Sequence, residues 1–375
     1  MHVVAMIALM AKMPCIPDEL PPNLDWRATA KLVGRGNAAI ARYDGMLQSL
    51  PNPAVLLSPI TVNEAVLSSR IEGTQATLDQ VLEFDAGLEG AERRRGDVEE
   101  VSNYRIAVQI AEYALQERPL SLSLIKEVHQ RLMQGVRGRE KAPGQFREDQ
   151  NWIGRPGDPM DRARFVPPSP LVLPAALQAW ESFVQSDAED PVVQAAIAHA
   201  QFEILHPFKD GNGRIGRMLI PLLLYQRRAL SAPMFYLSEY LEAHREEYYD
   251  RLLAITDASD WQGWMDFFIE AVVIQAEVNF TKARAIQDLY QEMRTAFAEV
   301  TKSPNAHRAV DAFFKRPIIA APKFFADGEF NNRVTANNIL QRLVEARLIE
   351  RIREGAGQRP SVYALTRLIE IADGR

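Results

Sequence analysis

One stretch of the sequence, residues His206–Arg217, decides the expected fold and chemistry. It reads His-Pro-Phe-Lys-Asp-Gly-Asn-Gly-Arg-Ile-Gly-Arg. Apolar segments with helical character flank it at Val192–Leu205 and Met218–Tyr225, so the sequence predicts two helices joined by a short polar loop. This loop brings a proton acceptor, a carboxylate, glycines and two arginines within a few residues of one another.

The loop has the residue types of an anion site. Gly211 and Gly213 lack a Cβ, so their backbone N–H groups can approach an anion closely. A helix beginning near Asn212 adds unpaired N–H groups and the positive end of its dipole. Arg214 and Arg217 are three residues apart and share a helix face, where they can bind successive phosphates. The pattern predicts a polyphosphate site at the start of this helix.

Two further side chains of the loop can carry chemistry. His206 is the group whose unperturbed pKa suits a general base near neutral pH. Asp210 offers a hard oxygen ligand of the kind that Mg²⁺ takes together with phosphates and waters. The alternative interpretation is a helix-to-helix loop with a glycine turn and a solvated basic face. The combination of all these positions in one loop favours a site that handles phosphates.

The stretch resembles the Fic motif, His-x-Phe-x-(Asp/Glu)-Gly-Asn-Gly-Arg-x-x-Arg, at every fixed position. Ser68–Gly73 resembles the inhibitory motif (Ser/Thr)-x-x-x-Glu-(Gly/Asn), placed N-terminal to the active loop as in one class of Fic proteins. The segments that resemble the Fic flap are Gly144–Arg147, Asn151–Gly154 and Phe165–Pro168. The resemblance extends from about residue 20 to about residue 280.

The resemblance implies an all-α fold, with a Fic helical core and a short β-hairpin flap. We expect an N-terminal helical region with the inhibitory helix at 1–96, the catalytic core at 97–295 and a further domain at 296–375. After Ser303 the pattern changes to three helices followed by two short strands, an order that resembles a winged helix.

The activity that the resemblance implies is the transfer of AMP from ATP to a hydroxyl of a target protein. His206 would take the proton from a Ser, Thr or Tyr hydroxyl, and Asp210 would hold Mg²⁺ or Mn²⁺. The residues that would bind the nucleotide are Gly211, Asn212, Gly213, Arg214 and Arg217. The flap, residues 151–166, would hold the target segment by backbone pairing, as an added strand.

The inhibitory segment implies that this activity limits itself. Thr61–Glu64 has the spacing of a capping box, which predicts a helix that begins there and ends near Gly73. The resemblance assigns an inhibitory role to Ser68 and Glu72. The Glu72 carboxylate is expected to form a bidentate pair with Arg217 and so to keep it from the γ-phosphate.

Two alternative functions stay open. One is a Fic-fold enzyme that uses another donor or removes AMP, because the phosphate cradle is shared. The other is an ATP-sensing regulator that binds DNA through residues 333–359, where Arg333, Asn337, Asn338, Arg342 and Arg359 could face it. Residues 301–375 hold 13 Lys and Arg against 8 Asp and Glu, a net +5, while the rest of the chain carries −11. A docking or dimerisation module is the competing interpretation.

The remaining features are typical of a cytoplasmic globular protein. Cys15 is the single cysteine of 375 residues, which excludes a disulfide framework within the chain. The nine-residue apolar run Val3–Ala11 is too short to span a bilayer, and we expect no membrane contact. His129 and His199 are interpreted as hydrogen-bonded core residues, with His199 beneath the site. The oligomeric state stays open, with a homodimer among the candidates.

Overall fold

The computed structural model describes residues 13–88, 95–135, 139–155 and 157–375. Within these ranges the chain is mostly helical and carries one three-stranded sheet near its C-terminus. The predicted all-α class is therefore confirmed. The apolar run Val3–Ala11 lies outside the described residues. In the described part of the chain, none of the helices is both long enough and apolar enough to cross a membrane.

Among the described residues, the N-terminal part of the chain forms five α-helices that lead into the core. They are α1 (Trp26–Ser49), α2 (Pro53–Leu56), α3 (Ser58–Ile71), α4 (Leu78–Asp85) and α5 (Arg95–Ala114). The later helices of the core are α6 (Leu122–Leu132), α7 (Leu173–Gln185), α8 (Pro191–Leu205), α9 (Asn212–Gln226), α10 (Ser238–Ala243), α11 (Arg245–Ala258) and α12 (Trp261–Thr301). Two short 3₁₀ helices, η2 (Arg139–Lys141) and η3 (Met160–Arg162), lie between α6 and α7.

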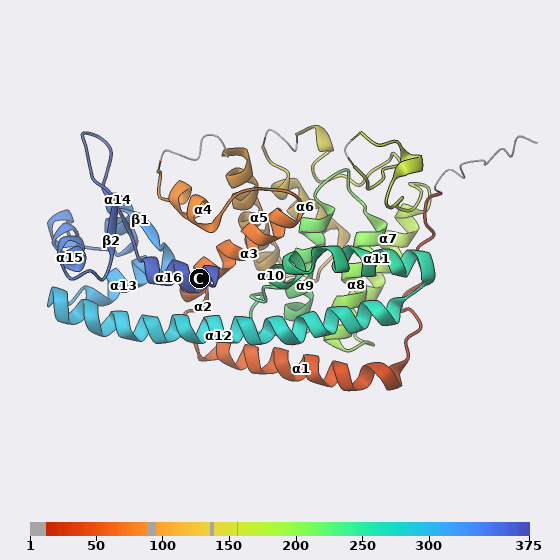
Figure 1. The fold of residues 1–375 in the computed structure, drawn as a ribbon, viewed down its shortest axis with the longest axis horizontal. Helices are drawn as coiled ribbons and strands as arrows, with labels where there is room; N and C mark the ends of the chain where they lie inside the picture. The colour runs from red at the N-terminus through yellow and green to blue at the C-terminus, as the bar shows by residue number, and fades with distance from the viewer. Residues whose placement is uncertain (1–12, 89–94, 136–138, 156) are drawn as a thin grey trace, which may run out of the picture.

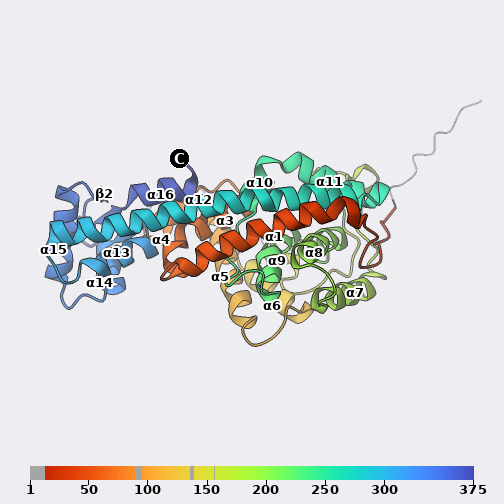
Figure 2. The same cartoon turned by 90° about the horizontal axis from the view of Figure 1, so that it is seen from below.

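Helix α12 runs along the length of the molecule, with α1 packed beside it (Figures 1 and 2). It continues across residue 296, so the C-terminal module is joined to the core by an uninterrupted helix. Helices α8 and α9 lie inside the core, and nearly every residue of both is buried. A helix that is apolar all round belongs in such a position, and it holds the loop between α8 and α9 in a fixed place.

The predicted start of α3 is wrong. The helix begins at Ser58, three residues before Thr61, and Leu57 at its N-cap makes no side-chain hydrogen bond. Pro59 lies in the first turn, where its fixed φ and missing N–H favour a helix start without a polar cap. Glu64 does not complete a capping box but accepts hydrogen bonds from the backbone N–H and hydroxyl of Ser238.

The C-terminal module follows α12. Its elements are α13 (Ala306–Lys315), β1 (Ile318–Ala320), α14 (Ala321–Asp327), α15 (Arg333–Glu345), β2 (Glu350–Arg353), β3 (Val362–Ala364) and α16 (Thr366–Asp373). The strands form an antiparallel sheet in the order β1-β3-β2, with both Ile319 and Arg351 opposite Tyr363. The three helices and the hairpin occur in the expected order, while β1 and α16 are additional elements. That this module is a winged helix stays a prediction.

The described residues of the segment expected to form the flap contain the short helix η3 and one isolated bridge in place of a regular hairpin. The N–H of Ile153 donates to the carbonyl of Phe165 at 2.8 Å, and the N–H of Phe165 donates back at 3.1 Å. This bridge ties the two sides of residues 151–166 together and leaves Trp152 and Ile153 exposed.

Candidate active site

The loop after α8 starts with a sharp reversal at His206. This residue caps α8 in the left-handed conformation, with φ 43° and ψ 59°, which is uncommon for a residue with a side chain. Phe208 follows, fully buried, and its ring stacks on the imidazole of His129 at 3.7 Å. His129 accepts a hydrogen bond from the N–H of Gly144, so its other nitrogen donates to the carbonyl of Asp210 at 2.9 Å. His129 therefore holds the loop, as a hydrogen-bonded buried group.

Arg147 secures the same loop from the other side. Its buried guanidinium donates to the carbonyls of Leu205, His206 and Pro168, at 3.3, 3.0 and 2.5 Å. A cation at this place also faces the negative end of the α8 dipole. Arg147 belongs to the segment Gly144–Arg147, so that resemblance pointed to a residue that fixes the position of His206.

The side chain of Asn212 has a structural use within the loop. Its side chain accepts from the N–H of Phe208 at 2.8 Å and donates to the carbonyl of Phe208 at 2.9 Å. The amide closes the loop on itself, so an anion would meet the backbone N–H of Asn212 and not its side chain. Gly211 allows the turn, with φ 80°, and a Cβ there would lie 2.9 Å from the sulfur of Met133.

The start of α9 holds the carboxylate of Glu72. A Cβ added to Gly213 would lie 2.1 Å from Oε1 of Glu72 and 2.9 Å from Nη1 of Arg217. Only glycine leaves this space open, and the carboxylate fills it. An anionic group of the chain itself therefore lies where the sequence predicted a phosphate.

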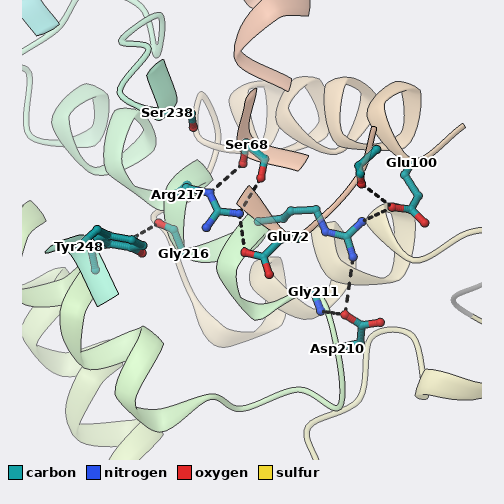
Figure 3. Close-up of polar contacts among 12 residues, drawn as sticks. Ser68, Glu72, Glu100, Asp210, Gly211, Gly216, Arg217, Ser238 and Tyr248 are labelled. Carbon is teal, nitrogen blue, oxygen red and sulfur yellow. Dashed lines mark hydrogen bonds and ion pairs between the residues drawn. The ribbon is translucent and has the colours of Figure 1, made fainter. Parts of the chain in front are cut away.

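Glu72 pairs with Arg217, as predicted, and Ser68 binds the same guanidinium (Figure 3). Nη2 of Arg217 donates to Oε1 of Glu72 at 2.7 Å and to the carbonyl of Ser68 at 2.8 Å, while Nε donates to the Ser68 hydroxyl at 3.0 Å. The expected bidentate pair is wrong in detail, because only Nη2 of Arg217 donates to Glu72, while Nε and Nη2 both donate to Ser68. The Arg217 side chain is 1% exposed and that of Glu72 36%.

The charge of Arg217 changes the pKa of the Glu72 carboxyl group. Burial alone would raise the pKa of Glu72, but the guanidinium of Arg217 outweighs it and the pKa lies below its usual value. Glu72 is therefore ionised at neutral pH, and the pair is a charge-assisted hydrogen bond.

Asp210 and Arg214 lie on the opposite side of the loop. Oδ1 of Asp210 accepts from the N–H of Gly211 at 2.6 Å and lies 3.7 Å from Nη2 of Arg214 (Figure 3). The Asp210 side chain is 45% exposed, whereas that of Arg214 is 7% exposed and 3.6 Å from Glu100. Nε of Arg214 is buried and has no hydrogen-bond partner among the described residues. A buried cation with an unused donor suits a bound anion.

The active loop offers one carboxylate, that of Asp210, as a ligand for a metal ion. Among residues 13–88, 95–135, 139–155 and 157–375, no group of three His, Cys, Asp or Glu could hold a metal ion. A half-exposed carboxylate beside a phosphate site fits Mg²⁺, which keeps several waters and takes the rest of its ligands from the substrate. Asp210 is the residue that fits this role.

His206 lies at the wall of a cavity of 1030 Å³. Burial lowers the pKa of its imidazole to about 4, although Glu72 acts in the opposite direction. Its Nδ1 is buried and lacks a hydrogen-bond partner within the described chain. The imidazole is thus neutral at pH 7 and can accept a proton.

The cavity brings together His206, Glu72, Gly213 and Arg217, four of the predicted residues. Asp210, Gly211, Asn212 and Arg214 belong to the same loop and helix start but do not line it. The other lining residues come from the flap, from α8 and from α11: Trp152, Ile153, Gly154, Arg155, Asp158, Arg162, Arg164, Phe165, Glu203, Ile204, Arg245, Tyr249, Leu252 and Leu253. Five arginines around one cavity favour an anionic ligand.

Glu203 is a site residue that the sequence did not single out. It lies one helical turn before His206, and Oε1 is buried without a hydrogen-bond partner in the described part of the chain. Burial raises the pKa of its carboxyl to about 8, partly offset by Arg217. A Cβ on Gly216 would lie 2.1 Å from Oε1, so this glycine makes room for the carboxyl group.

His199 lies beneath the site, as interpreted from the sequence. Its Nδ1 donates to the carbonyl of Gly216 at 2.8 Å, and its Nε2 accepts from the hydroxyl of Tyr248 at 3.0 Å. Burial lowers the pKa of His199 to about 3, so the ring stays neutral.

Helix α15, which carries four of the five residues predicted to face DNA, lies at the opposite end of the molecule from α8 and α11, whose residues line the cavity (Figure 1). Arg333, Asn337 and Asn338 are exposed on α15. Arg342 donates to the carbonyl of Thr301 at 2.6 Å, and Arg359 lies in the exposed loop between β2 and β3.

Cys15 is tied to the chain near the flap. Its N–H donates to the carbonyl of Val166 at 3.0 Å, and burial raises the pKa of its thiol to about 12. The thiol is therefore protonated and unreactive at neutral pH.

Two family models match the chain. Residues 30–112 match the model described as Fic/DOC family N-terminal, and residues 119–224 match the model described as Fic/DOC family. Together they include α3, the active loop and most of α9.

Curated relatives match part of the chain. A probable protein adenylyltransferase of Aquifex aeolicus is 26% identical over 196 residues, which cover 51% of this chain and 56% of the relative. The protein adenylyltransferase Fic of Drosophila grimshawi is 33% identical over 161 residues, covering 41% of this chain and 31% of the relative. The chain thus spans less than two thirds of the length of these relatives.

Solved structures resemble the fold of most of the chain. A Fic family protein from Desulfovibrio desulfuricans G20 has a TM-score of 0.59 and 21% identity, over 92% of this chain and 98% of the other. Fic-1 of C. elegans, residues 134–508, has a TM-score of 0.53 and 18% identity, over 70% of this chain and 75% of the other. At this identity the likeness shows the fold.

Proposed function

The chain belongs to the Fic/DOC family, and from this premise we propose that it transfers AMP from ATP to a Ser, Thr or Tyr hydroxyl of a target protein. We propose further that Glu72 restrains this activity. The observation that carries both is the Glu72 carboxylate at the start of α9, paired with Arg217 in the cavity that His206 lines. The two relatives described above are named protein adenylyltransferases, which supports the reaction class.

The proposed reaction starts at His206. Its neutral imidazole takes the proton of the target hydroxyl, and the hydroxyl oxygen forms a bond to the α-phosphorus of ATP. The bond between that phosphorus and the bridging oxygen of the β-phosphate breaks, and pyrophosphate leaves with the electron pair. The chain contributes no covalent bond of its own, so its work is positioning and charge stabilisation.

The start of α9 would hold the phosphates. The backbone N–H groups of Asn212 and Gly213 would bind an anion there, joined by that of Gly211 once Asp210 releases it, and Nε of Arg214, which has no partner among the described residues, would add a charged donor. Arg217 would take the γ-phosphate once Glu72 has left it. Asp210 would hold Mg²⁺ or Mn²⁺, which when bound neutralises charge on the phosphate oxygens.

The flap supports docking of the target. Trp152 and Ile153 are exposed and line the same cavity as His206. An extended target segment could add to this bridge by backbone pairing, which requires little of the target's side chains. A cytoplasmic location, where ATP and protein hydroxyls are both available, is part of the same proposal.

Glu72 restrains the activity because its carboxylate competes with the γ-phosphate of ATP for one binding place. The Glu72 carboxylate and a γ-phosphate are both anions, and both require Arg217 and the space above Gly213. ATP bound beside Glu72 would have its phosphates displaced, and misplacement by about 1 Å can cost roughly 10²-fold in rate.

The test is incubation of the purified protein with ATP labelled at the α-phosphate, with Mg²⁺ or Mn²⁺ and a cell lysate. We expect label in protein with Glu72→Gly, little with the wild type, and a fall of about 10²–10⁴-fold when His206→Ala is added. Label from a different nucleotide would support another donor, and loss of AMP from a modified target would support the reverse reaction. A folded Glu72→Gly protein that binds ATP but transfers nothing would contradict the proposal.

A second candidate function is DNA binding through the C-terminal module. The observation that favours it is the exposed first half of α15, where Arg333, Asn337 and Asn338 offer the side chains that read base edges. A gel-retardation series at increasing salt tests it: binding should weaken with salt and fail with Arg333→Ala. Absence of salt-sensitive binding would favour the docking alternative.

A further inference from the structure

The C-terminal helix α16 leaves its own module and lies against α3, the helix that ends at Glu72. Figure 1 shows the C-terminus beside α3, and α16 packs on both α3 and α12. Leu368, Ile369 and Ala372 are its buried residues. Two segments about 300 positions apart in the sequence thus form one contact.

One carbonyl group joins three helices at this contact. The side-chain N–H of Asn63 on α3 donates to the carbonyl of Ala372 at 3.0 Å, and Nζ of Lys282 on α12 donates to the same oxygen at 3.3 Å. Lys282 also donates to Glu239 on α10 at 2.8 Å. Ala372 lies in the last turn of α16, where carbonyls have no partner within the helix and require one from outside.

The hydrogen bond of Asn63 is buried, since that residue is 5% exposed. Its position on α3 is nine residues before Glu72, or about 13 Å along a helix. Neighbouring residues of α3 bind other elements: Thr61 lies 2.7 Å from the Tyr236 hydroxyl, and Glu64 binds Ser238. A helix transmits a shift at one end to the other because its backbone hydrogen bonds hold it rigid.

We propose that Asn63 is a positioning residue for Glu72: its bond to Ala372 ties α3 to α16, so that the C-terminal module sets how firmly Glu72 holds Arg217. This inference rests on the proposed restraint by Glu72. A partner that draws α16 away from α3 would loosen the Glu72–Arg217 pair and release the site. The C-terminal module is then a regulator of the cavity, whatever ligand its exposed face takes.

The test compares Asn63→Ala and the volume-matched Asn63→Leu with the wild type in the full-length protein. Both remove the donor, and Lys282 still satisfies the Ala372 carbonyl. The control is Arg375→Ala, which removes an exposed ion pair of the same C-terminus with Asp79. Thermal unfolding of each variant shows whether it is folded.

Self-labelling, measured with and without Glu72, separates a positioning role of Asn63 from a general loosening of the protein. Self-labelling by ATP should rise about two- to tenfold with Asn63→Ala, the factor by which one hydrogen bond shifts an equilibrium. In a Glu72→Gly background the same change should add nothing, because the restraint is already absent. An increase that persists without Glu72, or no increase in either folded Asn63 variant, overturns the proposal.

Hydrogen exchange gives a readout that does not require catalysis. The amides of residues 68–73 should exchange faster in Asn63→Ala and Asn63→Leu, but not in Arg375→Ala. Unchanged exchange overturns the inference independently of any activity. Faster exchange in a protein whose Glu72→Gly form transfers no AMP would support the tie while contradicting the proposed function.

Discussion

The strength of the Glu72–Arg217 pair predicts how far each substitution of Glu72 raises the rate of AMP transfer. The pair is a charge-assisted hydrogen bond, worth about 1.5–3 kcal/mol. Glu72 is 36% exposed, and solvent weakens such a pair, so the lower half of that range applies, about 1.5–2 kcal/mol. The pair would then keep Arg217 occupied in all but roughly 3–7% of molecules.

Glu72→Gly should therefore raise the rate of AMP transfer by about 10–30-fold, with the full gain only when Arg217 is present. Glu72→Gln keeps the shape and a neutral hydrogen bond, so its gain should be about three- to sixfold smaller, consistent with the weaker bond. The assay is the initial rate of protein labelling at saturating ATP, with the ATP affinity measured in parallel. Equal rates for wild type, Glu72→Gln and Glu72→Gly, in folded proteins that bind ATP, would refute the reasoning.

Four further outcomes are expected. Because burial lowers the pKa of His206 to about 4, transfer should persist down to about pH 5 and fall as the imidazole protonates near pH 4; a pH–rate profile with a fall at 6.5 would contradict this. Glu203 is neutral below its pKa of about 8 and anionic above it, so calorimetry should show weaker ATP binding at pH 9 than at pH 6.5, and Glu203→Gln should abolish the difference. Asp210→Ala should remove the response of activity to Mg²⁺ or Mn²⁺ and leave the circular dichroism unchanged. Asn212→Ala leaves the N–H and carbonyl of Phe208 without partners, so denaturant unfolding should show a loss of about 1–3 kcal/mol or more.

The active loop was predictable because its residues act locally. The backbone freedom of Gly211 and Gly213 and the helix start at Asn212 depend on neighbours within a few positions, and the structure places them in one turn. The same locality explains the correct end of α3 near Gly73. Its wrong start has a local cause as well, because Pro59 allowed a beginning that needs no polar cap.

Other features depend on partners far away in the sequence. Thr61 and Glu64 have capping-box spacing, yet their side chains bind Tyr236 and Ser238, and no local pattern signals this. Glu203 lies among apolar residues of α8. Its place in the site becomes visible only in the structure, where it lines the cavity and Gly216 leaves space for its carboxyl group. Glu72 accepts one hydrogen bond from Arg217 while Ser68 accepts two, and the sequence spacing does not determine this division.

The boundary predicted at residue 296 stays untested, but the contacts across it bear on any truncation. Ser58 donates to the carbonyl of Lys315, and α16 covers part of α3. Removing everything after Ser303 would expose buried surface of α3 and the side chain of Asn63. Such a shortened chain would report on restraint as well as on the C-terminal module.

The 41 residues of α12 form a strut about 60 Å long. One half of it packs in the core and the other half contacts α13 and α15. A continuous helix does not swing as a linker does, so the separation between the cavity and the exposed face of α15 is constant. A molecule bound at α15 would bring the proteins attached to it close to the flap. Their effective concentration at the flap would be set by the length of α12, even if they made no direct contact with this protein. The protein that is modified would then be selected by its distance from α15.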